Sequence, residues 1–293
     1  MQFDGIYVPL VTPFDRQGEI DQRQLETLVE AMLERGVAGL VAGGTTGEYY
    51  ALNDAERTQV LKIVQRVAGG RVPLMAGIGD LSTRRAVERA AEAHAIGYDS
   101  LLLSAPPYSL PDQAGIRAHF EHVATHCALP VVLYNFAARV GVNLEFETVA
   151  ALARHPNIVA IKESSGNFSQ ALRLLQAELA NFEVICGCDD QPVDFFFWGA
   201  TGWIAGAGNV FPGEQVALHR AARAGDWNRA RALMRALYPA LHSMEAGDYN
   251  QKAKAGCLNA TLDAGDVRLP LSPLDAEAKA AFRELVRGAS VCR

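Results

Sequence analysis

Residues 155–167 read HPNIVAIKESSGN and carry the clearest indication of the fold. The apolar run Ile158–Ile161 has Pro-Asn before it and Ser-Ser-Gly after it, which is typical of a buried parallel strand. Lys162 closes this strand. A lysine at such a place either extends into water or is desolvated in a site, and desolvation lowers the pKa of an ammonium group. In a site, Lys162 would be a neutral nucleophile able to form a Schiff base with a ketone.

Short apolar runs of this kind alternate with amphipathic segments along the whole chain. The segment Gln22–Arg35 has a helical pattern, with apolar residues recurring every three or four positions on one stripe. Capping boxes, in which two side chains satisfy free amides at a helix start, begin at Asp21, Asn53 and Asn167. The expected strands are Ile6–Val11, Gly39–Ala42, Val72–Ala76, Ser100–Leu103, Val131–Tyr134, Ile158–Ile161, Glu183–Cys186 and Trp203–Ala205.

Eight strand-helix units fill the chain from the first strand to about Gly225, or roughly 27 residues per unit, which is close to the module size of a (β/α)8 barrel. We therefore predict an α/β fold: a TIM barrel catalytic domain over residues 1–225 and a C-terminal helical extension of three helices over residues 226–293. A doubly wound open sheet is the alternative. It is disfavoured by the even count of eight and by the lack of G-x-G-x-x-G after the first strand.

Composition excludes some classes of function. The chain has 293 residues, of which 49% are hydrophobic and 20% charged, as in a soluble globular protein, and its net charge of −6 argues against nucleic-acid or anionic-membrane partners. Its N-terminus shows no signal peptide and no stretch looks like a membrane span. The five scattered cysteines, at positions 127, 186, 188, 257 and 292, indicate reduced thiols and a cytoplasmic protein. Cys186 and Cys188 share a strand face and could bind a metal, but without a His or Cys cluster we expect core packing.

Polar signals follow three of the expected strands, at the end of a barrel where chemistry occurs. Strand two leads into Gly43-Gly-Thr-Thr-Gly-Glu48, strand five ends at Tyr134-Asn135, and strand six ends at Lys162. Strands five and six should be neighbours, so the phenol and the amine can share a cavity, with the glycine-rich loop across from them to hold an anionic group. Each signal has a structural alternative, a tight turn for the loop and core packing for Tyr134. Their convergence at one end favours a site.

These residues resemble the pyruvate-dependent class I aldolase family that includes dihydrodipicolinate synthase and N-acetylneuraminate lyase. The resemblance covers essentially the whole chain, and the ordered combination of G-T-T-G-E, Y-N and I-K-E is specific for the family but not for the member. The matching motifs are Pro9-Leu-Val-Thr-Pro-Phe14, Gly44-Thr-Thr-Gly-Glu48, Tyr134-Asn135, Ile161-Lys-Glu163, Gly166-Asn167 and Leu269-Pro-Leu271.

The resemblance implies roles for the site residues. Lys162 would condense with pyruvate, while Tyr134 and Thr45 would relay protons together with Tyr108 from the neighbouring subunit of a homodimer or homotetramer. The loop's backbone amides, including that of Thr46, would bind the pyruvate carboxylate. Gly44 and Ile204 complete the expected substrate-binding set. The resemblance implies no metal and no organic cofactor.

Members of the family differ in the second substrate that they bind, so the residues that contact it indicate which activity to expect. Arg139 falls where the synthases carry an arginine that binds the carboxylate of aspartate semialdehyde, although Ala137 and Val140 replace the usual proline and threonine. The leading hypothesis is therefore a 4-hydroxy-tetrahydrodipicolinate synthase of lysine and diaminopimelate biosynthesis. The alternative is a lyase, dehydratase or deaminase acting on a sugar acid or on a hydroxyproline-derived 2-keto acid. A non-catalytic metabolite-binding barrel would need the lysine or tyrosine to be missing, and both are present.

The resemblance also bears on regulation, because some family members are inhibited by lysine at a dimer-interface pocket. A large or like-charged side chain in that pocket would disfavour the ligand, although Arg57 would attract its carboxylate. We therefore expect an enzyme insensitive to lysine. The corresponding positions are Tyr49, Tyr50, Asp54, Arg57, Leu81, Arg85 and Pro107.

Overall fold

The computed structural model describes residues 2–289. Residues 290–293, with Cys292 and the end of the expected extension, lie outside the described part. The strands are β1 (Gly5–Pro9), β2 (Gly39–Ala42), β3 (Leu74–Gly77), β4 (Ser100–Ser104), β5 (Val131–Asn135), β6 (Ile158–Glu163), β7 (Glu183–Cys186) and β8 (Gly202–Ile204).

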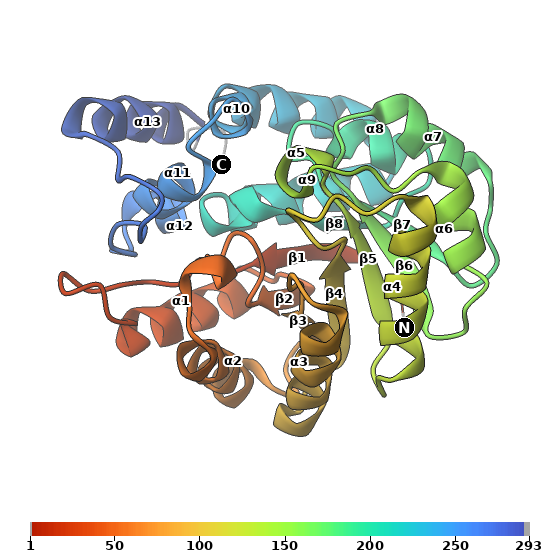
Figure 1. The fold of residues 1–293 in the computed structure, drawn as a ribbon. Helices are drawn as coiled ribbons and strands as arrows, with labels where there is room; N and C mark the ends of the chain where they lie inside the picture. The colour runs from red at the N-terminus through yellow and green to blue at the C-terminus, as the bar shows by residue number, and fades with distance from the viewer. Residues whose placement is uncertain (1, 290–293) are drawn as a thin grey trace.

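All eight strands are parallel and form a closed barrel, in which each pairs with the next and β8 pairs with β1 (Figure 1). Nearly every strand residue is buried, because one face of the barrel wall fills the interior and the other packs on helices. The closed order confirms the predicted (β/α)8 TIM barrel and excludes the open sheet.

Only β2 and β7 have the bounds that the sequence predicted, and the other strands differ by one or two residues at one or both ends. Strand β6 does not stop at Ile161 but continues to Glu163, since Lys162 pairs with Tyr134 on β5 and with Ile185 on β7. Strand β1 ends at Pro9 and not at Val11, whose amide instead donates to the Asn209 side chain at 3.0 Å. The extension of β6 matters for function, because it fixes the backbone of Lys162 within the barrel wall.

Helices cover the outside of the barrel. The helical stretches between and after the strands are α1 (Gln22–Glu34), the 3-10 turn η1 (Tyr49–Ala51), α2 (Asp54–Ala68), α3 (Thr83–Ile96), α4 (Gln113–Thr125), α5 (Ala137–Val140), α6 (Phe146–Leu152), α7 (Phe168–Gln176), α8 (Pro192–Phe197), the 3-10 turn η2 (Gly206–Asn209) and α9 (Pro212–Arg223). Asn53 and Glu56 form a complete capping box, whereas Asp21 and Asn167 only accept a hydrogen bond from the third helical amide. The one-turn helix α5 is an addition to the simple barrel plan.

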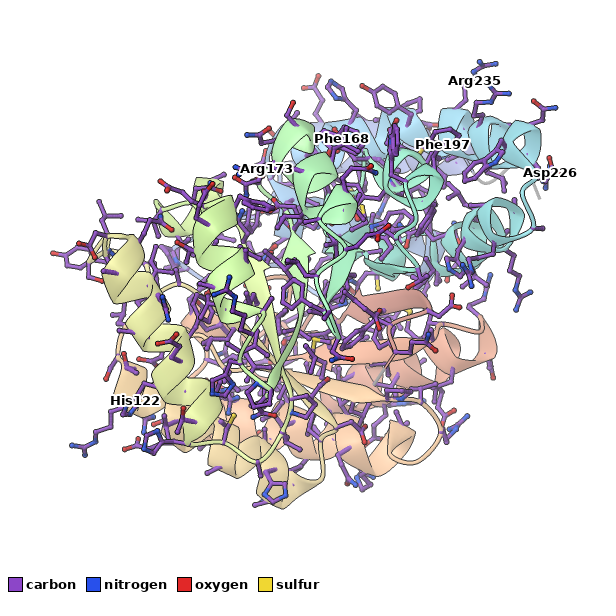
Figure 2. All side chains as sticks on the ribbon, turned by 90° about the vertical axis from the view of Figure 1, so that its right-hand side faces the viewer. His122, Phe168, Arg173, Phe197, Asp226 and Arg235 are labelled. Atoms are coloured by element: carbon purple, nitrogen blue, oxygen red, sulfur yellow. The ribbon has the colours of Figure 1, made fainter. Side chains whose placement is uncertain are left out.

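After α9 the chain continues into α10 (Trp227–Glu245), α11 (Tyr249–Ala255), the short α12 (Cys257–Ala260) and α13 (Ala276–Ala289). Within α12, Leu258 and Asn259 have left-handed backbone angles, so this stretch is a turn and not a regular helix. Phe197 at the end of α8 packs edge-to-face on Trp227 at the start of α10, and Figure 2 shows Phe197 on the helical layer outside the strands. Among residues 2–289, no helix is both long and apolar enough to cross a bilayer.

Candidate active site

Lys162 lies near the carboxyl end of β6, with its side chain inside the barrel mouth and only 6% of the residue exposed. Burial lowers the pKa of its ammonium to about 8, against the opposing effect of negative groups headed by Asp189. Desolvation therefore outweighs the nearby charges, and a useful fraction of the side chain is the neutral amine at neutral pH. This is the condition that a Schiff-base lysine must meet.

Tyr134 is the cross-strand neighbour of Lys162, and the Lys162 Nζ atom lies 4.3 Å from the centre of its ring. Burial raises the pKa of the phenol, while a side-chain hydrogen bond with Thr45 lowers it by less. The phenol thus keeps its proton at neutral pH and can donate it to a group that develops negative charge. Tyr134 and Thr45 are thus joined by a hydrogen bond, and their role as a proton relay stays what the resemblance implied.

The loop after β2, residues 44–47, brings Thr45 and Thr46 to the same cavity. It turns tightly, with the amides of Gly47 and Tyr49 both donating to the carbonyl of Gly44. Gly43 has a φ of +67°, which favours glycine. Within residues 2–289, the backbone amides of Thr45 and Thr46 have no hydrogen-bond partner. Two such amides at a cavity wall are suited to hold a carboxylate.

The cavity over these residues measures about 410 Å³ and opens at the carboxyl ends of the strands. Arg139, on the exposed helix α5, lines its mouth, and its guanidinium lies 5.9 Å from the centre of the Phe136 ring. The cavity therefore combines an amine, hydroxyl groups and a forked cation within one enclosure. Its lining is completed by Ala138, Ser164, Ser165, Gly166, Gly187, Cys188, Asp190, Gln191, Gly206, Met244, Glu245, Gly247, Tyr249 and Asn250.

Three of the expected site residues do not line this cavity. Tyr108 is 93% exposed and has a left-handed φ of +72°, so within this chain it is not brought to Lys162. Ile204 is buried in the barrel interior beside Tyr134. Gly44 is buried in the turn and contributes its carbonyl to the loop. The cavity thus gathers Lys162, Tyr134, Thr45, Thr46 and Arg139.

An acidic cluster near Lys162, formed by Asp189 and Glu245, was not predicted from the sequence. The carboxylate of Asp189, which is buried, accepts hydrogen bonds from Trp203 Nε1 at 3.1 Å, from the Ala207 amide at 2.8 Å and from the Tyr249 hydroxyl. Glu245 accepts the Asp189 amide at 3.1 Å, and desolvation followed by the charge of Asp189 raises the pKa of its carboxyl. The signal available in the sequence was the pair Asp189-Asp190, which begins three residues after the seventh strand ends at Cys186.

Comparison with known proteins identifies relatives over the whole chain. The model of the dihydrodipicolinate synthetase family matches residues 2–289. The 4-hydroxy-tetrahydrodipicolinate synthase of Exiguobacterium sibiricum is 39% identical over 269 residues, 92% of each chain. That of Methanoculleus marisnigri is 39% identical over 94% of this chain and 96% of its own.

Solved structures show the same likeness. The 4-hydroxy-tetrahydrodipicolinate synthase of Methylacidiphilum fumariolicum superposes with a TM-score of 0.94 at 32% identity, over 99% of this chain and 97% of its own. The dihydrodipicolinate synthase of Aquifex aeolicus gives a TM-score of 0.91 at 32% identity, over 98% of both chains.

Proposed function

The chain belongs to the dihydrodipicolinate synthetase family, and from this premise we propose that it is a 4-hydroxy-tetrahydrodipicolinate synthase, which condenses pyruvate with aspartate semialdehyde in lysine and diaminopimelate biosynthesis. The observation that carries this proposal is a desolvated Lys162 that shares one cavity with Arg139. The amine supplies the class I aldolase chemistry. The guanidinium supplies a site for the carboxylate of the second substrate.

The geometry supports a sequence of steps on these residues. The Lys162 amine adds to the ketone of pyruvate, water leaves, and the imine loses a methyl proton to give an enamine. The enamine carbon then attacks the aldehyde of the second substrate, and the new alkoxide takes a proton from the Tyr134–Thr45 hydroxyl pair. The amino group of the second substrate finally attacks the imine carbon, which closes the ring and releases the Lys162 amine. The amides of Thr45 and Thr46 hold the pyruvate carboxylate throughout.

A steady-state assay with pyruvate and aspartate semialdehyde, run beside a panel of sugar-acid and hydroxyproline-derived keto acids, tests this function. The purified protein should turn over the first pair with the highest kcat/KM. A higher value for a member of the panel would replace the synthase assignment with the corresponding lyase, dehydratase or deaminase.

Assembly and location are part of the same proposal. Tyr108 is almost fully exposed, and we propose that it enters the cavity of a second copy in a homodimer or a dimer of dimers. The thiols of Cys127, Cys186, Cys188 and Cys257 are free, which supports a reducing compartment, the cytoplasm. Light scattering that gives the mass of a single chain at assay concentration would contradict the shared-site arrangement.

Arg139→Ala should raise the KM for aspartate semialdehyde much more than the KM for pyruvate. The reason is that the lost guanidinium contacts a carboxylate that only the second substrate presents at the cavity mouth. Initial rates with each substrate varied in turn give both constants. Arg139→Lys is the matched control and should recover only part of the loss, because an ammonium lacks the planar fork. Equal effects on both substrates would contradict this role.

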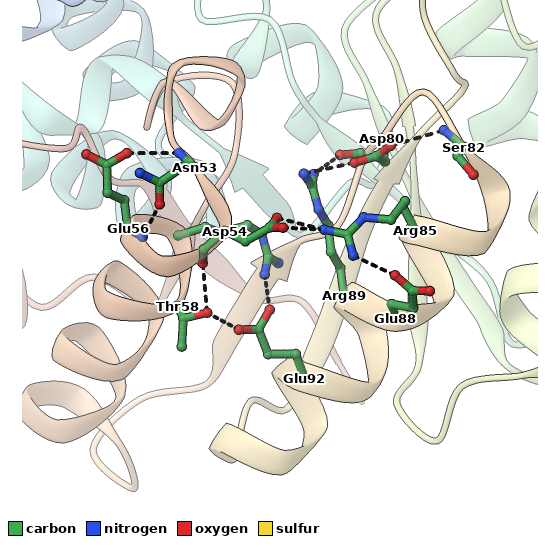
Figure 3. A network of polar contacts seen from close by, with 12 residues as sticks. Asn53, Asp54, Glu56, Thr58, Asp80, Ser82, Arg85, Glu88, Arg89 and Glu92 are labelled. Carbon is green, nitrogen blue, oxygen red and sulfur yellow. Dashed lines mark hydrogen bonds and ion pairs between the residues drawn. The ribbon is translucent and has the colours of Figure 1, made fainter.

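Three of the pocket positions expected from lysine-inhibited relatives, Asp54, Arg57 and Arg85, take part here in ion pairs, and Figure 3 shows the contacts of Arg85 with Asp54 and Glu88. Arg85 Nη2 lies 2.7 Å from both carboxylate oxygens of Asp54, and Arg85 Nη1 lies 2.6 Å from Glu88. Arg57 is only 1% exposed, and its guanidinium donates to Glu92 at 2.6 Å and to the carbonyl of Gly77 at 2.9 Å. We therefore infer that Arg57 is not available to a ligand carboxylate, because its guanidinium already binds Glu92 and Gly77 within the chain.

Lysine at millimolar concentration should accordingly leave the initial rate unchanged. The ligand's ammonium would meet the guanidinium of Arg85, which already engages the carboxylates of Asp54 and Glu88, while the exposed Tyr50 and Leu81 have no amide or carboxylate side chain to bind it. Assays at several lysine concentrations, with calorimetric titration of the same protein, measure this. Saturable inhibition, or heat that fits a binding isotherm, would contradict it.

A further inference from the structure

A buried ion pair joins the glycine-rich loop to the C-terminal extension. Glu48, the residue that follows the Gly44–Gly47 turn, places its Oε1 atom 2.7 Å from the Nζ atom of Lys254 on α11. The exposed fractions of these side chains are 0% and 1%. The other oxygen of Glu48 accepts the backbone amide of Arg268 at 2.9 Å. The carboxylate is therefore held entirely by residues more than 200 positions later in the chain.

The ammonium of Lys254 has several polar and aromatic partners besides Glu48. Its ammonium also donates to the carbonyl of Asp266 at 2.9 Å and lies 4.0 Å from the centre of the Phe14 ring. The guanidinium of Arg268 lies against the same ring at 4.2 Å. Burial lowers the pKa of Lys254 to about 8, while Glu48 is the first of the groups that raise it. Apolar side chains of similar size often stabilise a protein core as well as a buried ion pair does. The contribution of Glu48 and Lys254 to folding stability therefore does not explain why the pair is present.

The extension holds the loop at a second point. The side-chain amide of Asn250, also on α11, donates to the carbonyl of Thr45 at 3.0 Å, and the backbone amide of Glu48 donates to that carbonyl at 3.1 Å. Glu48 itself has a left-handed backbone, with φ of +56°, which a residue with a side chain adopts at a cost. Thr45 and Thr46 are thus fixed between Asn250 at one end and Lys254 at the other.

We propose that Lys254 is a positioning residue, which holds Glu48 and so sets the orientation of the Thr45 hydroxyl and the Thr46 amide toward the substrate carboxylate. This inference rests on the proposed function, in which that carboxylate belongs to pyruvate. On this account the C-terminal extension is part of the catalytic unit, since it completes the substrate-binding loop from outside the barrel.

The test is the double variant Glu48→Gln, Lys254→Met, which removes both charges and so leaves no unpaired charge in the core. Its half-saturating pyruvate concentration should rise about tenfold or more, in borohydride trapping and in steady-state rates alike, because a small misplacement of a binding group weakens the contact it makes. The KM for aspartate semialdehyde should change by less than about twofold, because Arg139 lies on α5, which follows β5 and not β2. The matched control is Arg287→Met, which removes a surface ion pair with Glu284 on α13 of the same extension and should leave both constants unchanged.

The positioning role of Lys254 requires that the double variant bind pyruvate more weakly and aspartate semialdehyde nearly as well as wild type. A double variant with a lowered unfolding temperature but wild-type half-saturation for pyruvate would reduce the pair to a structural role and overturn the proposal. An equal rise in both substrate constants would do the same. A wild-type protein that forms no imine with pyruvate would instead overturn the proposed function, and this inference with it.

Discussion

Lys162→Ala should lose all measurable condensation of pyruvate with aspartate semialdehyde. The loss should exceed the roughly 10²- to 10⁴-fold cost of removing general acid–base help, because every covalent intermediate forms on this amine. The variant should still fold, since shortening this buried side chain removes a group whose charge is already disfavoured there. Stopped assays that compare the condensation rate of the variant with that of a dilution series of the wild-type enzyme measure the loss. Circular dichroism checks that the variant is folded.

Lys162→Arg is the matched control for charge. A guanidinium is not deprotonated in proteins, so this variant keeps a cation and still forms no imine. In the wild-type enzyme, the rate of imine formation should rise with pH through about 8, as the ammonium of Lys162 loses its proton. Turnover by either variant near the wild-type rate would show that another amine does the chemistry.

Tyr134→Phe should lower kcat by about 10²-fold or more while leaving pyruvate binding largely intact. Phenylalanine keeps the ring that lies 4.3 Å from Lys162 Nζ but removes the hydroxyl that bonds to Thr45. Single-turnover rates, compared with the half-saturation of borohydride trapping, separate the two effects.

Tyr98→Phe is the control for loss of a buried hydroxyl. The Tyr98 hydroxyl donates to the carbonyl of Leu61 at 3.0 Å, away from the cavity, so this change should lower the free energy of unfolding by about 1–3 kcal/mol and leave kcat unchanged. A kcat for Tyr134→Phe within twofold of wild type would assign Tyr134 to core packing.

The barrel could be predicted from the sequence because its signals are local. A buried parallel strand is a short apolar run between turn residues, and eight such runs alternate with helical patterns. The meeting of Lys162, Tyr134 and Thr45 also followed, because parallel strands bring their carboxyl ends to one rim. The continuation of β6 to Glu163 did not follow, since a lysine and a glutamate break the apolar run that marks a strand.

Contacts between distant parts of the chain could not be predicted in the same way. Nothing near Lys254 in the sequence indicates that its ammonium meets Glu48, because that contact depends on how the extension folds back over the barrel. The inward orientation of Arg57 has the same origin, since Glu92 on a neighbouring helix provides its partner. The exposure of Tyr108 could not be predicted either, because its proposed partner is a second copy of the chain and not a residue of its own.

The central claim is that Lys162 is the residue that forms a Schiff base with pyruvate. The most direct measurement is reduction by borohydride in the presence of pyruvate, followed by mass spectrometry of the intact protein and of its peptides. We expect one reduced pyruvate per chain, attached to Lys162 in the peptide that contains residues 158–163, and no adduct on Lys162→Ala. An adduct on Lys254 or any other lysine, or an equal yield from Lys162→Ala, would contradict the account.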